Sequence, residues 1–306
     1  MSEANPTTVA VVGLGAMGVG MAKTLASKGF RTLGFDLSQA RLDEAAAGGV
    51  EPAAALGDAL ARAEFVVFSL PTAKDVAGVV DEHFARIGSA TGGRVVIVDT
   101  STSEPEVSRD LARRLGQAGH GFLDAPVSGG PAGAASGSLA MMIGGEEADF
   151  ALARPVIEAM ATKILHVGPS GAGNVAKLVN NLLVAAHMIT TAEGLKLAAA
   201  AGVSPDAVLR VLNAASGKSF LSDVHFPTWI MSERFDSGFT AGLMRKDVRL
   251  AQALAAESGV SLPLTTEAAR LWAESGDTVS DRDDFTRMGA FKDPNETPAA
   301  KGASHG

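Results

Sequence analysis

A lysine and an asparagine four residues apart are the first candidates for chemistry in this sequence. Lys177 and Asn181 follow two glycines, Gly171 and Gly173, and lie in a long apolar run with helical spacing. In a helix, side chains at positions i and i+4 project from one face about one turn apart. An amine beside an amide on one face can hold a substrate and exchange a proton with it. A solvated surface lysine is the alternative.

The start of the chain carries a glycine pattern that is typical of dinucleotide binding. A short apolar run at 9–12 is followed at once by Gly13, Leu14, Gly15, Ala16, Met17 and Gly18. A helical pattern comes next, and then a second expected strand at 31–35, which ends in Asp36. In this fingerprint the glycines permit a tight turn, close approach of the pyrophosphate and close packing of helix on strand, with the helix N-terminus facing the phosphates.

Asp36 bears on which nicotinamide cofactor binds. A carboxylate at this position accepts hydrogen bonds from the ribose hydroxyls of NAD and repels the 2′-phosphate of NADP. Leu37 and Ser38 add no cation, although Arg41 is near enough in sequence to leave NADP open. NAD is therefore the predicted cofactor.

Strand patterns alternate with helical ones through the first half of the chain. Two of these expected strands, at 65–70 and 94–99, run into Leu70, Pro71 and Thr102. Strand ends line the ligand crevice of a parallel sheet, so these residues are placed to touch the cofactor. Ordinary turn chemistry is the alternative for each. Further strands are expected at 31–35, 121–125, 139–143 and 164–167.

A hydroxyl residue and two glycines follow the strand expected at 121–125. Ser128, Gly129 and Gly130 offer several backbone N–H groups to an anion, which predicts a cradle for a substrate carboxylate. A flexible surface loop is the alternative.

Composition excludes several classes of function. The 306 residues carry a net charge of −8, which argues against a nucleic-acid-binding or anionic-membrane surface. Without cysteine there is no disulfide, thiolate catalysis or thiolate metal site, and without tyrosine there is no Tyr/Lys proton-donating pair. The apolar run Leu182–Val203 carries His187, Glu193 and Lys196, so we expect a buried helix rather than a membrane span. We expect a cytoplasmic protein.

Two domains are expected from the order of these patterns. The strand signal disappears after residue 168, and a helix from Lys177 to about Ala201 would span about 40 Å. The predicted fold is α/β: an N-terminal Rossmann-type parallel-sheet domain at 1–168, joined by this long helix to an all-α domain at 169–292. Helices are also expected at 246–258 and 264–275. Residues 293–306 are expected to be disordered, and the chain is expected to form a homodimer or homotetramer.

Histidine and metal chemistry find less support. The histidines that could compete for proton transfer are His120, His166, His187 and His225. No aspartate or glutamate lies at a sequence spacing from any of them that indicates a catalytic pair, so we expect structural roles for these histidines. No histidine pair has ligand spacing and no HExxH motif occurs, so no metal site is expected.

Four blocks of sequence can be compared together: Gly13–Gly18, Asp124–Gly130 continuing to Leu139, Gly171–Asn181, and Lys246-Asp247. In that order and spacing they resemble the β-hydroxyacid dehydrogenase family, which includes 3-hydroxyisobutyrate dehydrogenase, tartronate semialdehyde reductase and threonate dehydrogenase. The resemblance covers nearly everything from Val9 to about Phe291.

The resemblance implies a role for each matching residue. Lys177 matches the catalytic lysine, and Asn181 matches the amide that orients the substrate hydroxyl or carboxylate. The residues that match substrate-binding positions are Ser128, Gly129, Gly130, Phe239 and Asp247, and those that match cofactor contacts after the glycine loop are Thr102 and Lys246. For Asp247, a structural pairing with a nearby cation is the alternative.

The implied reaction moves a hydride between NAD and the hydroxyl-bearing carbon of a small 3-hydroxy acid, with Lys177 as general acid and base. A free lysine has a pKa of about 10.4, so its neutral form requires a lower value. Burial and a second cation, for which Lys246 is a candidate, both lower a lysine pKa.

Substrate identity and two other functions stay open. Lys218 could pair with a second anionic or polyhydroxy group of the substrate and favour threonate- or sulfolactate-like substrates over 3-hydroxyisobutyrate, or it could be an exposed loop lysine. The alternatives in function are a catalytically silent nucleotide-binding module and an NADPH-dependent semialdehyde reductase of the same family. Retention of Lys177, Asn181 and Ser128 favours an active hydroxy-acid enzyme over a silent module or an imine reductase of the same fold.

Overall fold

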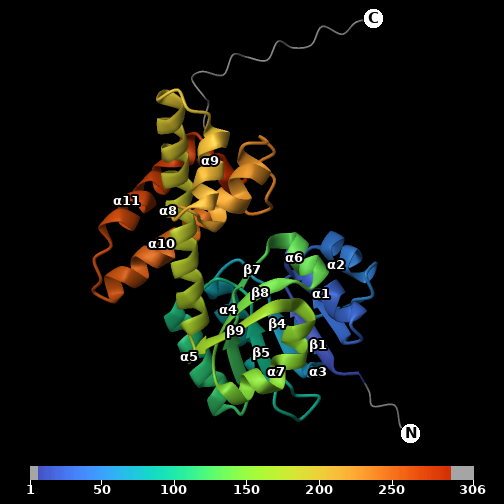
Figure 1. Cartoon of the computed structure of the whole chain (residues 1–306). Helices are drawn as coiled ribbons and strands as arrows, with labels where there is room; N and C mark the ends of the chain where they lie inside the picture. The colour runs from blue at the N-terminus through green and yellow to red at the C-terminus, as the bar shows by residue number, and fades with distance from the viewer. Residues whose placement is uncertain (1–5, 291–306) are drawn as a thin grey trace, which may run out of the picture. The chain divides into compact units, whose positions relative to one another are not determined.

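The structure is a computed structural model that describes residues 6–290 (Figure 1). The chain divides into two compact units between Asn180 and Asn181, within helix α8 (Ala172–Ala200). The domain limits predicted at 168 and 169 stay a prediction, and the tail predicted at 293–306 lies outside the described residues. The two units are described separately below.

One sheet organises the first unit. Its strands in the described residues are β1 (Thr8–Val12), β2 (Arg31–Phe35), β3 (Glu51–Pro52), β4 (Phe65–Phe68), β5 (Val96–Asp99), β6 (Gly121–Asp124), β7 (Val127–Ser128), β8 (Leu139–Gly144) and β9 (Ala161–Gly168). They lie in the order β3-β2-β1-β4-β5-β6-β8-β7, with β9 paired to β8. Every pair from β3 to β6 is parallel, whereas β8 runs antiparallel to β6 and β7.

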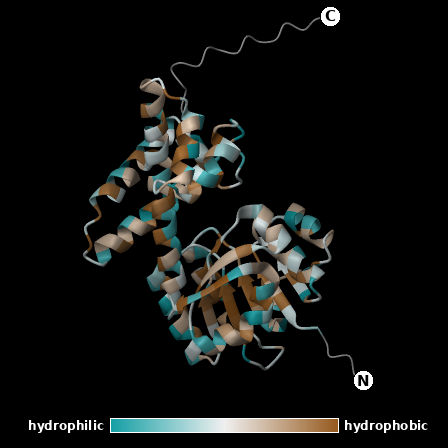
Figure 2. Cartoon of the chain, in the orientation of Figure 1, coloured by the Kyte–Doolittle hydropathy of each residue, from teal (hydrophilic) through white to brown (hydrophobic). Residues whose placement is uncertain are grey.

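Helices cover both faces of this sheet, and the strands are apolar on both faces for that reason. Along β1, Val9 and Val11 join the core under α1, α6 and α7, whereas Ala10 and Val12 join the core under α3, α4 and α5. Figure 2 shows these strands as the hydrophobic centre of the unit. The helices are α1 (Gly18–Ser27), α2 (Gln39–Ala46), α3 (Leu56–Arg62), α4 (Ala73–His83), η1 (Phe84–Arg86), α5 (Pro105–Gln117), α6 (Gly130–Ser136) and α7 (Glu147–Met160).

The second unit is helical over its described residues. After the C-terminal part of α8 it contains α9 (Pro205–Ala214), a π-helix η2 (Leu221–Ile230), α10 (Ala241–Glu257), α11 (Pro263–Glu274), and the short helices η3 (Ser275–Asp277) and η4 (Phe285–Gly289). The α/β fold class, with a parallel-dominated sheet followed by helices, is confirmed.

Several predicted element limits were wrong. The strand predicted at 65–70 ends at Phe68, and helix α10 begins at Ala241 rather than at 246. Helix α8 begins at Ala172, five residues before the predicted start. Gly173, one of the two glycines before Lys177, lies inside the helix, where a Cβ would overlap the carbonyl oxygens of Asp124 and Met142. Close packing of the helix start, rather than a turn, requires this glycine.

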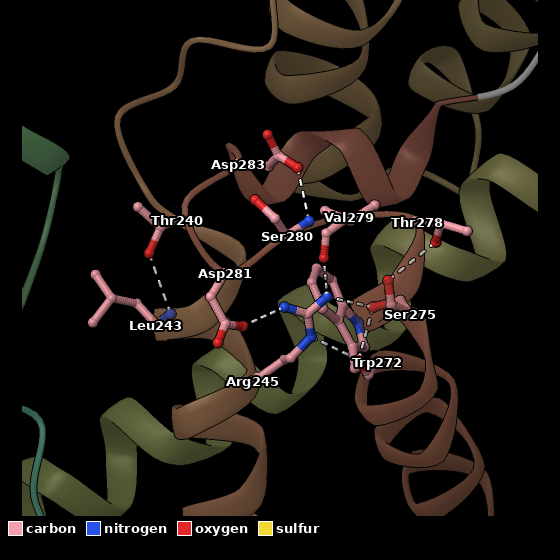
Figure 3. Close-up of polar contacts among 10 residues, drawn as sticks. All are labelled: Thr240, Leu243, Arg245, Trp272, Ser275, Thr278, Val279, Ser280, Asp281 and Asp283. Atoms are coloured by element: carbon pink, nitrogen blue, oxygen red, sulfur yellow. Dashed lines mark hydrogen bonds and ion pairs between the residues drawn. The ribbon is translucent and has the colours of Figure 1, made fainter.

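Arg245 anchors helix α10 within the second unit (Figure 3). Its Nε donates to the carbonyl of Trp272 over 2.9 Å, and its Nη2 donates to Ser275 Oγ over 2.7 Å and to the carbonyl of Val279 over 2.5 Å. Its Nη1 pairs with Asp281 at 2.5 Å. Four partners on the segment that ends and follows α11 thus fix the turn of α10 that also carries Lys246 and Asp247.

Helix α8 is the one described helix that is long and apolar enough to cross a membrane by length and composition alone, with 29 residues and a hydropathy of 1.2. The core helix of a soluble protein passes the same test. Among the polar side chains of this helix, Asn174, Lys177 and Asn181 are buried, whereas His187, Glu193 and Lys196 are exposed.

Candidate functional site

The glycine loop follows β1, and a side chain would have a different consequence at each of its three glycines. Gly13 has a φ of 89°, and a Cβ there would overlap the carbonyl oxygen of Ser69. A Cβ on Gly18 would overlap the carbonyl oxygen of Gly13. Gly15 is exposed, and a Cβ there would meet nothing within 4 Å. The packing of the chain therefore requires Gly13 and Gly18, whereas Gly15 leaves open space beside the start of α1, where a pyrophosphate fits.

Asp36 lies against this loop. One carboxylate oxygen accepts from the backbone N–H of Leu14 over 2.7 Å, and the other accepts from the N–H of Ser38 over 2.8 Å. The fold thus brings the predicted ribose-binding acid to the predicted phosphate-binding loop. Of the remaining loop residues, Ala16 is exposed and Met17 is half-buried.

The predicted cofactor contacts after β4 and β5 lie on adjoining loops. The N–H of Leu70 donates to Ser101 Oγ over 3.0 Å, which ties the loop of Leu70 and Pro71 to the loop of Thr102. Pro71 is exposed and Thr102 is half-buried. Because β4 and β5 are parallel neighbours, these residues lie at the same edge of the sheet as the glycine loop.

Ser128, Gly129 and Gly130 form an ordered turn between a strand and a helix. Ser128 pairs with Ala140 at the end of β7, and α6 begins at Gly130. The φ angles of Gly129 and Gly130 are 128° and 63°, a region that favours glycine. The backbone needs both glycines here, so glycine density in this segment reflects a specific turn.

A buried carboxylate that sequence reasoning did not single out holds the start of α8. Asp124, at the end of β6, is fully buried and accepts from the N–H of Gly171 over 2.7 Å and of Asn174 over 2.9 Å. Burial raises the pKa of Asp124 above its ordinary value, although these N–H groups act in the opposite direction. Gly171 and Asn174 belong to the predicted block, but no spacing in the sequence indicates their contact with Asp124.

Lys177 and Asn181 are both buried on α8, with exposed fractions of 7% and 4%. A solvated surface lysine is therefore the wrong interpretation. Asn181 Nδ2 donates to Asp247 Oδ2 over 2.6 Å, and Lys246 Nζ lies 3.5 Å from Asp247 Oδ1. Asp247 thus has the cationic neighbour expected of a structural residue, and it also binds the amide of Asn181.

Phe239 belongs to an aromatic cluster in the second unit. Its ring lies 5.5 Å from that of Phe285, which in turn lies 5.4 Å from the ring of His225. The rings of Trp229 and of the exposed Phe220 also pack on His225, with ring centroids 4.9 and 5.4 Å from that of the histidine. His225 lies on the π-helix η2.

The other histidines have structural surroundings. His120 Nδ1 accepts from the N–H of Val95, and His166 Nε2 lies 2.7 Å from the carbonyl of Gly145 while its ring stacks on Phe150. His187 is exposed. Among residues 6–290 no group of three or more metal-binding side chains comes together. Lys218 is half-exposed and lies 2.9 Å from the carboxylate of Asp223.

Replacing His225 by phenylalanine is expected to flatten the dependence of stability on pH. Burial lowers the pKa of His225 below 6.5, so the folded state prefers the neutral ring. The free energy of unfolding therefore falls as pH drops below about 6.5 and continues to fall towards the folded-state pKa. Part of that loss persists in the variant, because burial and Arg94 also lower the pKa of His120.

Urea unfolding at about pH 7.5 and about pH 5.5 measures this difference. Trp229→Phe is the matched control, because it alters the same cluster without removing a titratable group and should keep the wild-type loss of stability. An equal loss in the His225→Phe variant and the wild type would show that His225 does not contribute.

Two family models together match nearly all of the described chain. Residues 8–168 match the NAD-binding domain of 6-phosphogluconate dehydrogenase, and residues 171–291 match the NAD-binding domain of NADP-dependent 3-hydroxyisobutyrate dehydrogenase.

Individual relatives agree with both models. The chain is 37% identical to NAD-dependent L-serine dehydrogenase of Pseudomonas aeruginosa, over 86% of this chain and 90% of the relative. It is 34% identical to 2-(hydroxymethyl)glutarate dehydrogenase of Eubacterium barkeri, over 86% and 87% of the two chains. A solved structure of Mycobacterium tuberculosis 3-hydroxyisobutyrate dehydrogenase with L-serine superposes with a TM-score of 0.86 at 35% identity, covering 93% of this chain and 98% of that one. This chain belongs to the β-hydroxyacid dehydrogenase family of NAD-dependent oxidoreductases.

Proposed function

We propose that this enzyme transfers a hydride between NAD and the hydroxyl-bearing carbon of a small 3-hydroxy acid, with Lys177 as general acid and base. The observation that carries the proposal is the burial of Lys177, which is 7% exposed on a helix whose start is hydrogen-bonded to the end of β6. Lysines are rarely buried without a chemical or structural task.

The glycine loop and Asp36 fit NAD. The residues we propose to hold it are Gly13, Leu14, Gly15, Ala16, Met17, Gly18, Asp36, Leu70, Pro71, Thr102 and Lys246. When bound, the nicotinamide ring supplies the acceptor for the hydride. In oxidation Lys177 takes the hydroxyl proton, and in reduction the protonated amine returns it.

For the substrate we propose Ser128, Gly129 and Gly130 as the carboxylate cradle, together with Phe239, Asp247 and Asn181. A carboxylate only accepts hydrogen bonds, so Asp247 must face the NH₂ group of Asn181. The amide oxygen of Asn181 then points the other way, as an acceptor suited to a substrate hydroxyl. Asp247 would thereby fix which atom of the amide meets the substrate.

The named relatives suggest a narrower substrate class. L-serine, 3-hydroxyisobutyrate and 2-(hydroxymethyl)glutarate all carry a CH₂OH group on the carbon next to a carboxylate. We propose that this chain takes a substrate of that kind. The carboxylate of Asp223 beside Lys218 disfavours a second anionic group there.

A substrate panel tests this proposal. The three acids above and threonate are each incubated with NAD, and the absorbance of reduced nicotinamide is followed. We expect turnover with at least one of the three hydroxymethyl acids and slower turnover of threonate. Absence of turnover with all three would contradict the proposal, and a clear preference for threonate would overturn the substrate class.

Replacing Asp36 by alanine is expected to raise KM for NAD by about tenfold or more, because a hydrogen bond to a charged group contributes roughly 1.5–3 kcal/mol. The preference for NAD over NADP should narrow, since the repulsion of the 2′-phosphate is lost as well. Kinetics with NAD and with NADP at a fixed substrate concentration measure this preference as the ratio of the two kcat/KM values. Glu51→Ala, which removes an exposed carboxylate on the neighbouring strand β3, is the control; an unchanged ratio in Asp36→Ala would contradict the assignment.

We further propose that the protein is a cytoplasmic homodimer or homotetramer with neither a nucleic-acid nor a membrane partner. The net charge of −8 supports the absence of a polyanionic partner. Exposed apolar side chains of the second unit, namely Leu183, Leu197, Val211 and Leu264, support self-association. Sedimentation equilibrium tests the assembly, and a purely monomeric species at micromolar concentration would contradict it.

A further inference from the structure

We propose that Asn174 is a positioning residue, which sets the loop of Thr102 against the helix turn of Lys177. The inference rests on the proposed function, because it concerns how a hydride site and a proton site are held in register. Every residue used below belongs to the first unit.

The side chain of Asn174 bridges two other elements. Its Oδ1 accepts from the backbone N–H of Ser103 over 2.9 Å, and its Nδ2 donates to Ser108 Oγ on α5 over 3.0 Å. All three residues are at most 1% exposed. Ser103 directly follows Thr102, so the amide of Asn174 holds the loop after β5 from within the protein.

The backbone of Asn174 is fixed independently of its side chain. Its N–H donates to Asp124, which also accepts from Gly171, so the first turn of α8 is bound to the end of β6. Lys177 lies three residues later on the same helix, where side chains three apart are neighbours on the surface of a helix. Asn174 therefore connects the strand end, the Thr102 loop and the turn that carries the lysine.

Packing leaves little freedom around this connection. A Cβ on Gly144 would lie 2.6 Å from Asp124 Oδ1 and 2.7 Å from the backbone nitrogen of Gly173. A Cβ on Gly171 would lie 3.0 Å from the carbonyl oxygen of Pro105. Gly144 and Gly171, together with Gly173, thus let β8, α5 and the start of α8 pack closely against one another.

The transfer of a hydride and a proton requires close positioning of the groups that receive them. A dehydrogenase removes a hydride and a proton from adjacent atoms of one alcohol, so the groups that receive them must keep a fixed separation. A displacement of about 1 Å can reduce the rate about 100-fold. A residue that links the two sides should therefore affect kcat more than the affinity for either ligand.

Two substitutions of Asn174 separate positioning from folding. Asn174→Ala removes both hydrogen bonds. In Asn174→Asp one carboxylate oxygen can still accept from the N–H of Ser103, and the hydroxyl of Ser108 can donate to the other. Position 174 is fully buried and its backbone N–H binds Asp124, which disfavours the ionised form, and a protonated carboxyl group offers the same acceptor and donor as the amide. Val80→Ala, a buried change on α4, serves as a control for loss of stability alone.

The experiment measures kcat, KM for NAD, the pH profile of alcohol oxidation and hydrogen exchange of the peptide at 100–108. We expect kcat of Asn174→Ala to fall by about 10- to 100-fold at every pH, with KM for NAD changed by less than about threefold and faster exchange at 100–108. Asn174→Asp should keep the slow exchange and recover most of kcat. Val80→Ala should keep the wild-type kcat and exchange at 100–108.

The results that would overturn the role of Asn174 differ from those that would contradict the proposed function. Wild-type kcat in Asn174→Ala, or an equal loss in Val80→Ala, would overturn the positioning role. Failure of Asn174→Asp to recover both kcat and slow exchange would also overturn it. A wild-type enzyme that turns over no 3-hydroxy acid would contradict the proposed function, and hydrogen exchange at 100–108 would then decide whether Asn174 holds the loop.

Discussion

Replacing Lys177 by methionine is expected to lower kcat by about 10²–10⁴-fold, the range that general acid–base groups contribute. Methionine retains much of the buried aliphatic stem, so the fold should survive the change. Affinity for NAD, measured by titration of the protein with NAD, should stay within about twofold, because the proposed cofactor contacts lie elsewhere. Steady-state oxidation of the best substrate in the panel measures the loss.

The control for this experiment is Lys163→Met on β9. Lys163 is exposed, so its substitution removes a positive charge without disturbing the interior, and it should leave kcat unchanged. If Lys177→Met kept more than a few per cent of wild-type turnover, the lysine would not be the proton acceptor.

The second large effect is expected from Gly15→Ala. A Cβ at this position meets no protein atom within 4 Å, so folding should be unaffected. The methyl group would instead occupy space that the pyrophosphate needs beside the start of α1. We expect the dissociation constant for NAD to rise at least about tenfold while the melting temperature stays the same.

Substitutions at two other glycines serve as controls for this experiment. Gly116→Ala on α5 also meets nothing within 4 Å, and it should alter neither NAD binding nor stability adversely. Gly18→Ala forces an overlap with the carbonyl oxygen of Gly13, so it should destabilise the protein as well as abolish binding. Unchanged NAD affinity in Gly15→Ala would show that the cofactor does not pass over this residue.

The elements that the sequence predicted well are those with strong local patterns. The continuous apolar run at 9–12 identifies a strand buried on both faces, and the glycine loop that follows it has few alternatives in conformation. Strand β3 and strand β7 have two residues each, too few for any periodicity. They form because neighbouring strands offer hydrogen bonds, which a single segment does not reveal.

The candidate site was predictable in its residue types and less so in its supports. Burial of Lys177 cannot be read from α8, since the helix is apolar on most sides. The contact of Asp124 with Asn174 joins residues 50 positions apart, and only the crossing of α8 over the end of β6 creates it. The ion pair between Lys218 and Asp223 is the opposite case. Its two residues lie only five positions apart, so their pairing was open to prediction from the sequence.

Isotope transfer tests the central claim most directly. The best substrate of the panel is deuterated at the carbon that bears the hydroxyl group and incubated with NAD and the wild-type protein, and the reduced cofactor is examined by mass spectrometry. Direct hydride transfer predicts that each reduced cofactor carries one deuterium. Reduced cofactor without deuterium, or no reduced cofactor at all, would contradict the account.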